Sequence, residues 1–373
     1  MNHTSPSIRL NQLGAAAFVL MLSPALRFFP SAASQSAGRA APLAALLALI
    51  PAALYLLGLR RLLARRAEGE GLCALIARAL PGRAGRMALL ALALWLSVYA
   101  GFILRSGADR FIVAVYPNTP GAFFIVTMAL AALSAAAASY RSTARTAKLV
   151  LPAVGGTLAL VLLFSLGSVR PENLALFPLS GRAFSFRGLA RGIVDALDVL
   201  LWSMWAAALL LGELKKEERA PLRLLGVLLL GGAVLALLCA SLIGSFGAPL
   251  TAKLSWPFFS LVRNLVFFRS IERIEALIVA LWVFPDFLIV SLFLRSARDC
   301  LRQSLGKRVS LFAGPTPALL LCGGVSLAFA LLAAPDAQRL ETLSMTVIPA
   351  ANLFFALVFF PAVLITGRVK RRL

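Results

Sequence analysis

The sequence predicts an all-α polytopic membrane protein. Of the 373 residues, 60% are hydrophobic, and the mean hydropathy is +0.89. The apolar residues fall into runs of about twenty, the length that an α-helix needs to cross the hydrocarbon core of a bilayer. The short alternating segments that indicate a membrane β-barrel do not occur in the sequence. Together these observations favour a bundle of transmembrane helices.

Ten apolar runs are long enough to be transmembrane helices, and we interpret the whole chain, residues 1–373, as one membrane domain. Gly and Pro inside several runs are compatible with this interpretation, because neighbouring helices can satisfy the backbone groups that these residues leave free. The predicted spans are 10–30, 42–59, 87–104, 121–139, 149–167, 193–212, 223–245, 274–294, 316–333 and 344–366.

The first run has two interpretations. Its apolar stretch Leu13–Leu22 follows Arg9 and precedes the small residues Ser31–Ala33, a pattern that a secretory signal peptide also shows. The segment Ser23–Pro30 instead suggests one helix that is interrupted and then resumes, since Pro24 disfavours helix at the residue before it. We favour a retained, discontinuous first span over a cleaved signal peptide.

The chain is strongly basic, with 37 Lys and Arg against 15 Asp and Glu. In a soluble protein this excess would suggest a nucleic-acid partner, but here the charges lie mainly in loops between the spans. The loops on one side carry about twice as many Lys and Arg as those on the other, so the positive-inside rule predicts that both termini are cytoplasmic. We therefore expect the anionic surface of a lipid bilayer, and no nucleic acid, as the partner of these charges.

Several kinds of catalytic site have no support in the sequence. His3 is the only histidine, the four cysteines lack metal or redox spacing, and no GxxxxGK[ST] phosphate loop occurs. A membrane enzyme acting on lipid-linked substrates would need polar catalytic residues clustered at one membrane face, and we find no such cluster. We expect a protein that is not an enzyme and that carries no metal or cofactor.

The stretch Leu261–Leu294 carries the most specific motifs, namely Leu261–Arg263, Ile271–Leu277, Ala280–Trp282 and Ser291–Leu294. In these motifs the chain resembles the permease-like B subunit of endospore germinant receptors. That spore permease family is a branch of the amino acid/polyamine/organocation permease superfamily. Weaker matches along the chain are Leu104-Arg105, Tyr116–Pro120, Pro171–Leu174 and the basic loop Glu213–Arg219.

The resemblance implies two inverted halves of five spans each, in which helices one and six are discontinuous and the ligand binds near the bilayer midplane. It also implies a membrane subunit of a germinant receptor in the inner (cytoplasmic) membrane of the spore. Such a subunit binds a small, amino acid-like germinant and signals to an A-type membrane subunit and a C-type lipoprotein subunit. A secondary active amino acid transporter, coupled to a proton or another cation, is the alternative, because it would need the same pocket.

The first candidate ligand-binding residues are Ser23, Pro24, Ala25 and Leu26, at the predicted interruption of span one. Backbone groups that Pro24 leaves free could hold the amino and carboxylate groups of a small zwitterion. The alternative is a structural kink of the kind that is common in membrane helices.

Asp195 and Asp198 lie three residues apart at the predicted start of span six, and Trp202 continues the same helical face. A carboxylate in an aromatic cleft suits an amino group. Alternatively, the two aspartates could cap the helix N-terminus. We select Asp198, which falls near a carboxylate of the family pattern, together with Trp202 as ligand-binding candidates, and we interpret Asp195 as a cap.

Asp286 lies inside the apolar run of span eight, one turn after Trp282. An ionisable group at membrane depth is costly and therefore indicates a function. Either Asp286 faces the ligand cavity beside Trp282, or it pairs with a cation such as Arg27 or Arg105. Tyr99 in span three completes the ligand-binding candidates, with an ordinary interhelical hydrogen bond as its alternative role.

Overall fold

The computed structural model describes residues 8–63, 67, 69–174, 185–214, 220–265, 274–305 and 309–369, and the structural statements below concern these ranges. All their regular structure is helical apart from one isolated bridge between Ile8 and Leu214. The all-helical part of the predicted fold class is thereby confirmed. The motif Ile271–Leu277 and the basic loop Glu213–Arg219 lie largely outside the described residues.

The elements follow one another with short connections. In order they are α1 (Leu10–Arg27), α2 (Phe29–Ala37), η1 (Gly38–Ala40), α3 (Ala41–Leu47), α4 (Leu49–Leu63), α5 (Leu72–Ala79), α6 (Arg83–Ala114), α7 (Gly121–Ala137), α8 (Tyr140–Ser165), η2 (Leu166–Ser168), α9 (Pro171–Leu174), α10 (Phe186–Ala208), η3 (Leu211–Glu213), α11 (Ala220–Phe246), α12 (Ala248–Thr251), α13 (Pro257–Asn264), α15 (Ile274–Leu305), η4 (Ser310–Ala313), α16 (Pro315–Leu332), α17 (Ala337–Met345), α18 (Val347–Leu353), the π-helical segment η5 (Phe354–Phe359) and α19 (Phe360–Val369).

Seven helical segments among the described residues are long and apolar enough to cross a membrane. They coincide with predicted spans two, three, five, seven, eight, nine and ten. The other three predicted spans correspond to α1, to the shorter α7 and to α10, so the division into ten spans and two inverted halves stays a prediction. The seven segments are Phe29–Arg60, Arg83–Ala114, Tyr140–Ser168, Arg223–Phe246, Leu277–Leu305, Pro315–Leu332 and Ala337–Val363.

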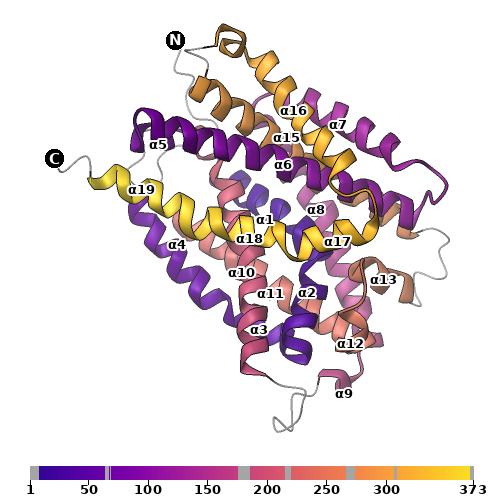
Figure 1. Cartoon of the computed structure of the whole chain (residues 1–373). Coiled ribbons are helices and arrows are strands. Elements are labelled where there is room, and N and C mark those ends of the chain that lie inside the picture. Colours follow the sequence, from indigo (N-terminus) through magenta and orange to yellow (C-terminus); the bar gives the residue numbers. More distant parts are fainter. Residues whose placement is uncertain are drawn as a thin grey trace.

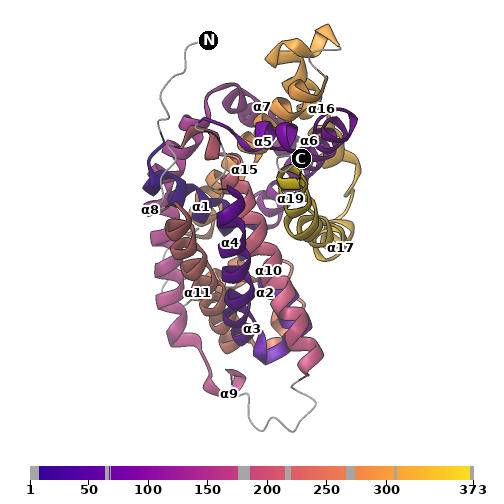
Figure 2. The same cartoon turned by 90° about the vertical axis from the view of Figure 1, so that its left-hand side faces the viewer.

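The helices form two groups that cross each other. Helices α6, α7, α15 and α16 pack together in one group, with α5 against α6 (Figure 1). Helices α2, α3, α4, α10 and α11 form the second group (Figure 2). Helix α1 lies between the groups and contacts α8, α10, α11 and α15, which places it in the hydrophobic core. Helices α17, α18 and α19 follow one another across the face turned to the viewer in Figure 1.

The interruption of the first span lies later than predicted. Helix α1 continues through Pro24 to Arg27, and the chain leaves the helix at Phe28, whose φ is −109°. The N–H of Phe28 still donates to the carbonyl of Pro24 at 3.4 Å, and Pro30 lies in the first turn of α2, where its missing N–H is harmless. The interruption thus lies inside the predicted segment Ser23–Pro30 but after the candidate residues Ser23–Leu26, which remain helical. A tightly packed membrane helix can accommodate a proline without ending.

The predicted discontinuity of helix six is also absent from its described part. Helix α10 starts at Phe186, where the Ser185 hydroxyl accepts from the N–H of Gly188 at 3.3 Å, and it runs without a break to Ala208. Only then do a turn and the short helix η3 follow. Because α10 begins so early, Asp195 lies well inside the helix, and its interpretation as an N-terminal cap was wrong.

A close crossing of α6 and α16 depends on a residue without a side chain. A Cβ on Gly101 would lie 2.4 Å from the carbonyl oxygen of Ser326, which is too short for any real contact. The Ser326 hydroxyl donates to the carbonyl of Ser97 at 2.7 Å. Small residues of this kind let membrane helices approach each other closely and exchange hydrogen bonds.

Candidate functional site

A small cavity lies where α1, α2, α6, α10, α17 and α18 meet. Its volume is about 40 Å³, which is room for roughly three water molecules. Aromatic rings from α6 and from the junction of α1 and α2 form part of its wall, and polar side chains from α10 and α18 form another part. These aromatic and polar lining residues include Phe28, Tyr99, Phe102, Asp195, Asp198 and Asn352.

Three oxygen atoms of the lining residues are buried without a hydrogen-bond partner in the described structure: Oδ2 of Asp195, Oδ1 of Asp198 and Oδ1 of Asn352. Asn352 lies next to both Asp198 and Tyr99. Neither carboxylate makes an ion pair with any described residue. A buried acceptor without a donor costs about 1–3 kcal/mol, and more when it is charged. Hydrogen-bond donors and positive charge on a bound molecule would satisfy these three oxygens, in addition to the contacts of Asp198 with Asn352 and of Asp195 with Ser36.

The aromatic wall of the cavity consists of rings that pack against one another. Tyr99 is 2% exposed, and its ring centre lies 5.4 Å from that of Trp202 and 5.4 Å from that of Phe293. Phe102 and Phe28 continue the wall, with ring centres 5.5 Å apart. The faces of such rings attract cations, an effect that is strongest where water is excluded.

Asp286 lies outside the cavity lining, in a buried ion pair. Its side chain accepts from the Ser23 hydroxyl and pairs with the Arg110 guanidinium, a cation that the sequence interpretation did not name. Asp286 is 1% exposed and Arg110 3% exposed. The pair joins α1, α6 and α15 at the point where the two groups of helices cross.

A second buried carboxylate adjoins this pair. Asp109 lies 3.7 Å from Arg105 one turn before it, and it accepts from the indole N–H of Trp256 at 3.2 Å. Arg105 also donates to the carbonyl of Ala334 at 2.7 Å. Each of the two carboxylates in this part of the molecule thus has a cation of its own.

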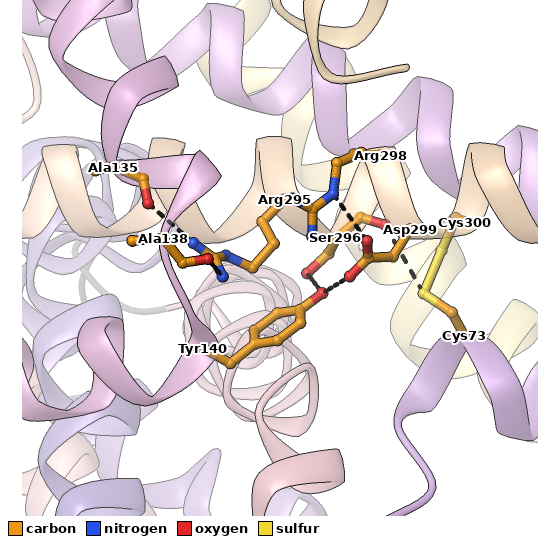
Figure 3. Close-up of polar contacts among 9 residues, drawn as sticks. All are labelled: Cys73, Ala135, Ala138, Tyr140, Arg295, Ser296, Arg298, Asp299 and Cys300. Carbon is orange, nitrogen blue, oxygen red and sulfur yellow. Dashed lines mark hydrogen bonds and ion pairs between the residues drawn. A yellow bond between two sulfur atoms is a disulfide. The ribbon is translucent and has the colours of Figure 1, made fainter. Parts of the chain in front are cut away.

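A second cavity, of about 220 Å³, lies at the end of the molecule that contains α5. Three of its polar side chains, those of Tyr140, Ser296 and Asp299, contact one another (Figure 3). The Tyr140 hydroxyl donates to Asp299 at 2.7 Å and lies 3.3 Å from the Ser296 hydroxyl, and Glu213 pairs with Arg141 at 3.0 Å. Among the described residues, no polar side-chain atom that lines the larger cavity is buried without a hydrogen-bond partner, whereas three that line the smaller cavity are.

The same region links three helices. A disulfide joins Cys73 of α5 to Cys300 of α15, and the Arg295 guanidinium donates to the carbonyls of Ala135 and Ala138 at the end of α7 (Figure 3). The guanidinium thus provides donors for the carbonyls at the C-terminal end of α7, where the Ala135 carbonyl also accepts from the Ala138 N–H. Together with the disulfide, these contacts fix the relative positions of α5, α7 and α15.

The structure brings some of the nine predicted ligand-binding residues together and separates others. Pro24, Tyr99 and Asp198 line the small cavity. Trp202 packs behind Tyr99, and Ser23 bonds to Asp286 outside the lining. The remaining three, Ala25, Leu26 and Trp282, are buried in the hydrophobic core. There the ring centre of Trp282 lies 5.1 Å from that of Phe258.

Sequence reasoning did not select the lining residues Phe28, Phe102 and Asn352, and it considered Arg27 only as a partner of Asp286. Asn352 and Arg27 carried a usable signal, because each is a polar residue inside an otherwise apolar run. Phe28 and Phe102 carried none, because an aromatic residue in a membrane span is usually part of the core. Their positions depend on where α1 ends and on how α18 packs against α10.

Comparisons with known proteins agree with this architecture. The structure is similar to that of MHP1, a nucleobase-cation-symport-1 family transporter, in a closed conformation with bromovinylhydantoin bound. The TM-score is 0.66 at 14% identity, over 95% of this chain and 78% of that chain, so the likeness shows a shared transporter-like fold.

No curated protein matches the sequence. The sequence profile of the spore permeases, described as spore germination protein, matches residues 8–322. With a transporter-like fold and several helices able to span a membrane, this chain is an integral, permease-like membrane protein and belongs to the spore germination protein family.

Proposed function

We propose that this protein is the membrane subunit of a spore germinant receptor and that it binds a small amine-bearing nutrient, an amino acid, whose ammonium group would occupy the 40 Å³ cavity. The observation that carries the proposal is the set of three unpartnered buried oxygens on Asp195, Asp198 and Asn352. An ammonium group offers three N–H donors and a positive charge, which matches this set. Tyr99 and Phe102 would provide the aromatic faces beside it.

The nine predicted ligand-binding residues then have different roles. Asp198, Tyr99 and Pro24 would contact the nutrient directly, and Trp202 would hold Tyr99 in position. Ser23 and Asp286 would act through the buried ion pair that positions α1 against α15. Ala25, Leu26 and Trp282 would act by packing.

Binding would be converted into a signal by a change of conformation. A ligand shifts an equilibrium between two states only if it binds one of them better. The elements around the cavity include two irregular points, the α1–α2 junction at Phe28 and the π-helical segment Phe354–Phe359 directly after α18. Segments of π-helix often occur at functional sites. Movement there would pass to an A-type membrane subunit and a C-type lipoprotein subunit.

The proposed location is the inner membrane of the spore, with both termini in the cytoplasm. The unequal distribution of Lys and Arg between the loops supports this orientation. In this role the protein performs no catalysis.

A secondary active amino acid transporter, coupled to a proton or another cation, is the second candidate. The similarity of its fold to that of a solved transporter supports it. A transporter and a sensor would use the same cavity, and they differ in whether the bound molecule leaves on the other side.

Binding and uptake of a mixture of the twenty labelled amino acids, measured in the same membranes, test the proposal. Saturable binding without accumulation in sealed vesicles would support a receptor subunit. Accumulation driven by an ion gradient would favour the transporter. Absence of saturable binding would contradict the amino acid site.

A further inference from the structure

Arg27 is a buried cation with free donors. It lies in the last turn of α1, is 5% exposed, and its Nε and Nη2 atoms have no hydrogen-bond partner in the described structure. Its guanidinium carbon lies 4.2 Å from the ring centre of Phe28, 4.7 Å from that of Trp256 and 5.3 Å from that of Phe102. Aromatic faces stabilise the positive charge, but they do not satisfy the N–H groups.

The charges around Arg27 do not balance. Asp286 and Asp109 are the carboxylates near it, and Arg110 is a nearby cation. Asp286 is paired with Arg110, and Asp109 lies beside Arg105. Three guanidinium groups thus share two carboxylates among the described residues, and Arg27 is the one without an ion pair. A buried charge without a partner is costly, so this region favours an additional anion.

The free atoms of Arg27 also indicate the shape of that anion. Nε and Nη2 lie on one edge of the planar guanidinium and present two parallel N–H groups. This edge matches the two oxygens of a carboxylate, and such a two-point contact is stronger than a neutral hydrogen bond.

Two aromatic rings connect the Arg27 guanidinium with the cavity. Phe28 and Phe102 line the cavity, and both also contact the Arg27 guanidinium. Phe28 lies at the interruption between α1 and α2, where φ is −109° and the bond from its N–H to the Pro24 carbonyl is long, at 3.4 Å. Tyr99 lies near both Arg27 and Asp198, so the cation and the unpaired carboxylate flank the same side chain.

We propose that Arg27 is the carboxylate subsite of the cavity, reached when the Phe28 ring turns aside. An α-amino acid would then place its ammonium group at Asp198 and Asn352 and its carboxylate on the Nε–Nη2 edge of Arg27. This inference rests on the proposed function, because it completes the same site. It identifies the nutrient as a zwitterion and distinguishes it from a simple amine.

The experiment compares two probes on the full-length protein in lipid nanodiscs. One is an equimolar pool of the twenty amino acids, and the other is the pool of their α-carboxamides, which keep the ammonium group and lose the carboxylate charge. The shift in Tm with concentration gives the half-saturating concentration of each pool. The protein should bind the acids roughly 10–100-fold better than the amides, as expected for a charged two-point hydrogen bond.

Substitutions assign this preference to Arg27. In Arg27→Gln the acids and amides should bind equally weakly, and in Arg27→Lys, which keeps the charge but not the planar edge, the preference should be reduced. Arg339→Gln, which replaces an exposed arginine, is the matched control and should leave the preference for acids unchanged. Measured without any probe, the Tm of Arg27→Gln should not fall below that of the unchanged protein, because the substitution removes an unpaired buried charge. A fall in Tm would be expected if Arg27 had only a structural role.

The outcomes separate the two proposals. Equal binding of acids and amides by the unchanged protein would overturn the Arg27 subsite and leave the amine site intact. A preference for acids that persists in Arg27→Gln would also overturn it. No response to either pool would overturn the proposed function itself.

Discussion

At the scale of single residues, the buried polar groups divide into those that are paired and those that are not. Asp286 and Arg110 satisfy each other, with Ser23 as a further partner. Asp198 and Arg27, by contrast, each keep buried polar atoms without a partner in the described structure, and both lie near Tyr99. Paired groups position helices, whereas unpaired groups indicate where a ligand completes the structure.

Asp286→Ala should therefore destabilise the protein before it affects any ligand contact. The substitution leaves Arg110 as an uncompensated buried cation, which costs about 3–5 kcal/mol when one partner of a buried pair is removed. We expect a clear fall in Tm in detergent without any added amino acid. The double variant Asp286→Leu/Arg110→Leu should recover part of the loss, because it leaves no charge unpaired. A single variant as stable as the unchanged protein would show that the ion pair has no structural role.

The residue scale is also where sequence reasoning was least complete. It selected Asp198, which falls near a carboxylate of the family pattern, and Tyr99 in span three, and both line the cavity. It placed Asp195 at a helix end because hydropathy located the start of α10 too late. It could not connect Asn352 with Asp198, since their contact depends on how α18 packs against α10.

At the scale of elements, hydropathy located the helices but underestimated the lengths of α6 and α15. Helix α6 continues to Ala114 although the predicted span ended at 104, because Arg105, Asp109 and Arg110 find partners inside the protein. Helix α15 likewise continues past 294, where Arg295 bonds to the carbonyls at the end of α7. Charged residues end an apolar run in the sequence, but they do not end a helix whose neighbours satisfy them.

The crossing of α6 and α16 gives a prediction with a matched control. Gly101→Ala places a methyl group against the backbone of Ser326, so the helices must move apart, and the protein should lose about 1–3 kcal/mol. Gly324→Ala, on α16 itself, meets nothing within 4 Å and should be neutral or slightly stabilising. Thermal unfolding of the two variants side by side measures the difference. Equal stability would contradict the close crossing.

The disulfide between α5 and α15 gives a second prediction. Cys73 and Cys300 are 227 residues apart in the chain, with Cα atoms 5.6 Å apart, so the bond closes a very long loop and should contribute about 2–4 kcal/mol. A reductant should lower the Tm of the unchanged protein to that of Cys73→Ser, which should itself not respond to reductant.

Cys322→Ser is the control for this experiment, because Cys322 is a buried free thiol. This variant should keep the full response to reductant. An unchanged protein whose Tm is the same with and without reductant would show that the bond between α5 and α15 contributes nothing to stability.

At the scale of the whole molecule, helices from two crossing groups contribute to one small cavity whose lining includes two carboxylates, Asp195 and Asp198, without an ion pair among the described residues. Composition and hydropathy were sufficient to predict a helical membrane protein, and the motifs near 261–294 were sufficient to predict its family, which the match over residues 8–322 confirms. The positions of the helix interruptions were not predictable, because Pro24 marks a possible break and packing decides whether the helix ends there.

The central claim is that the cavity binds the ammonium group of an amino acid through Asp198. The most direct measurement is the half-saturating concentration of the labelled amino acid mixture for the full-length protein in nanodiscs, compared with Asp198→Asn. This variant keeps the size of the side chain and removes its charge, so binding should weaken roughly 10–100-fold without a loss of Tm. Glu341→Gln, a carboxylate on α17 away from the cavity lining, should bind like the unchanged protein. Undiminished binding by Asp198→Asn would contradict the account.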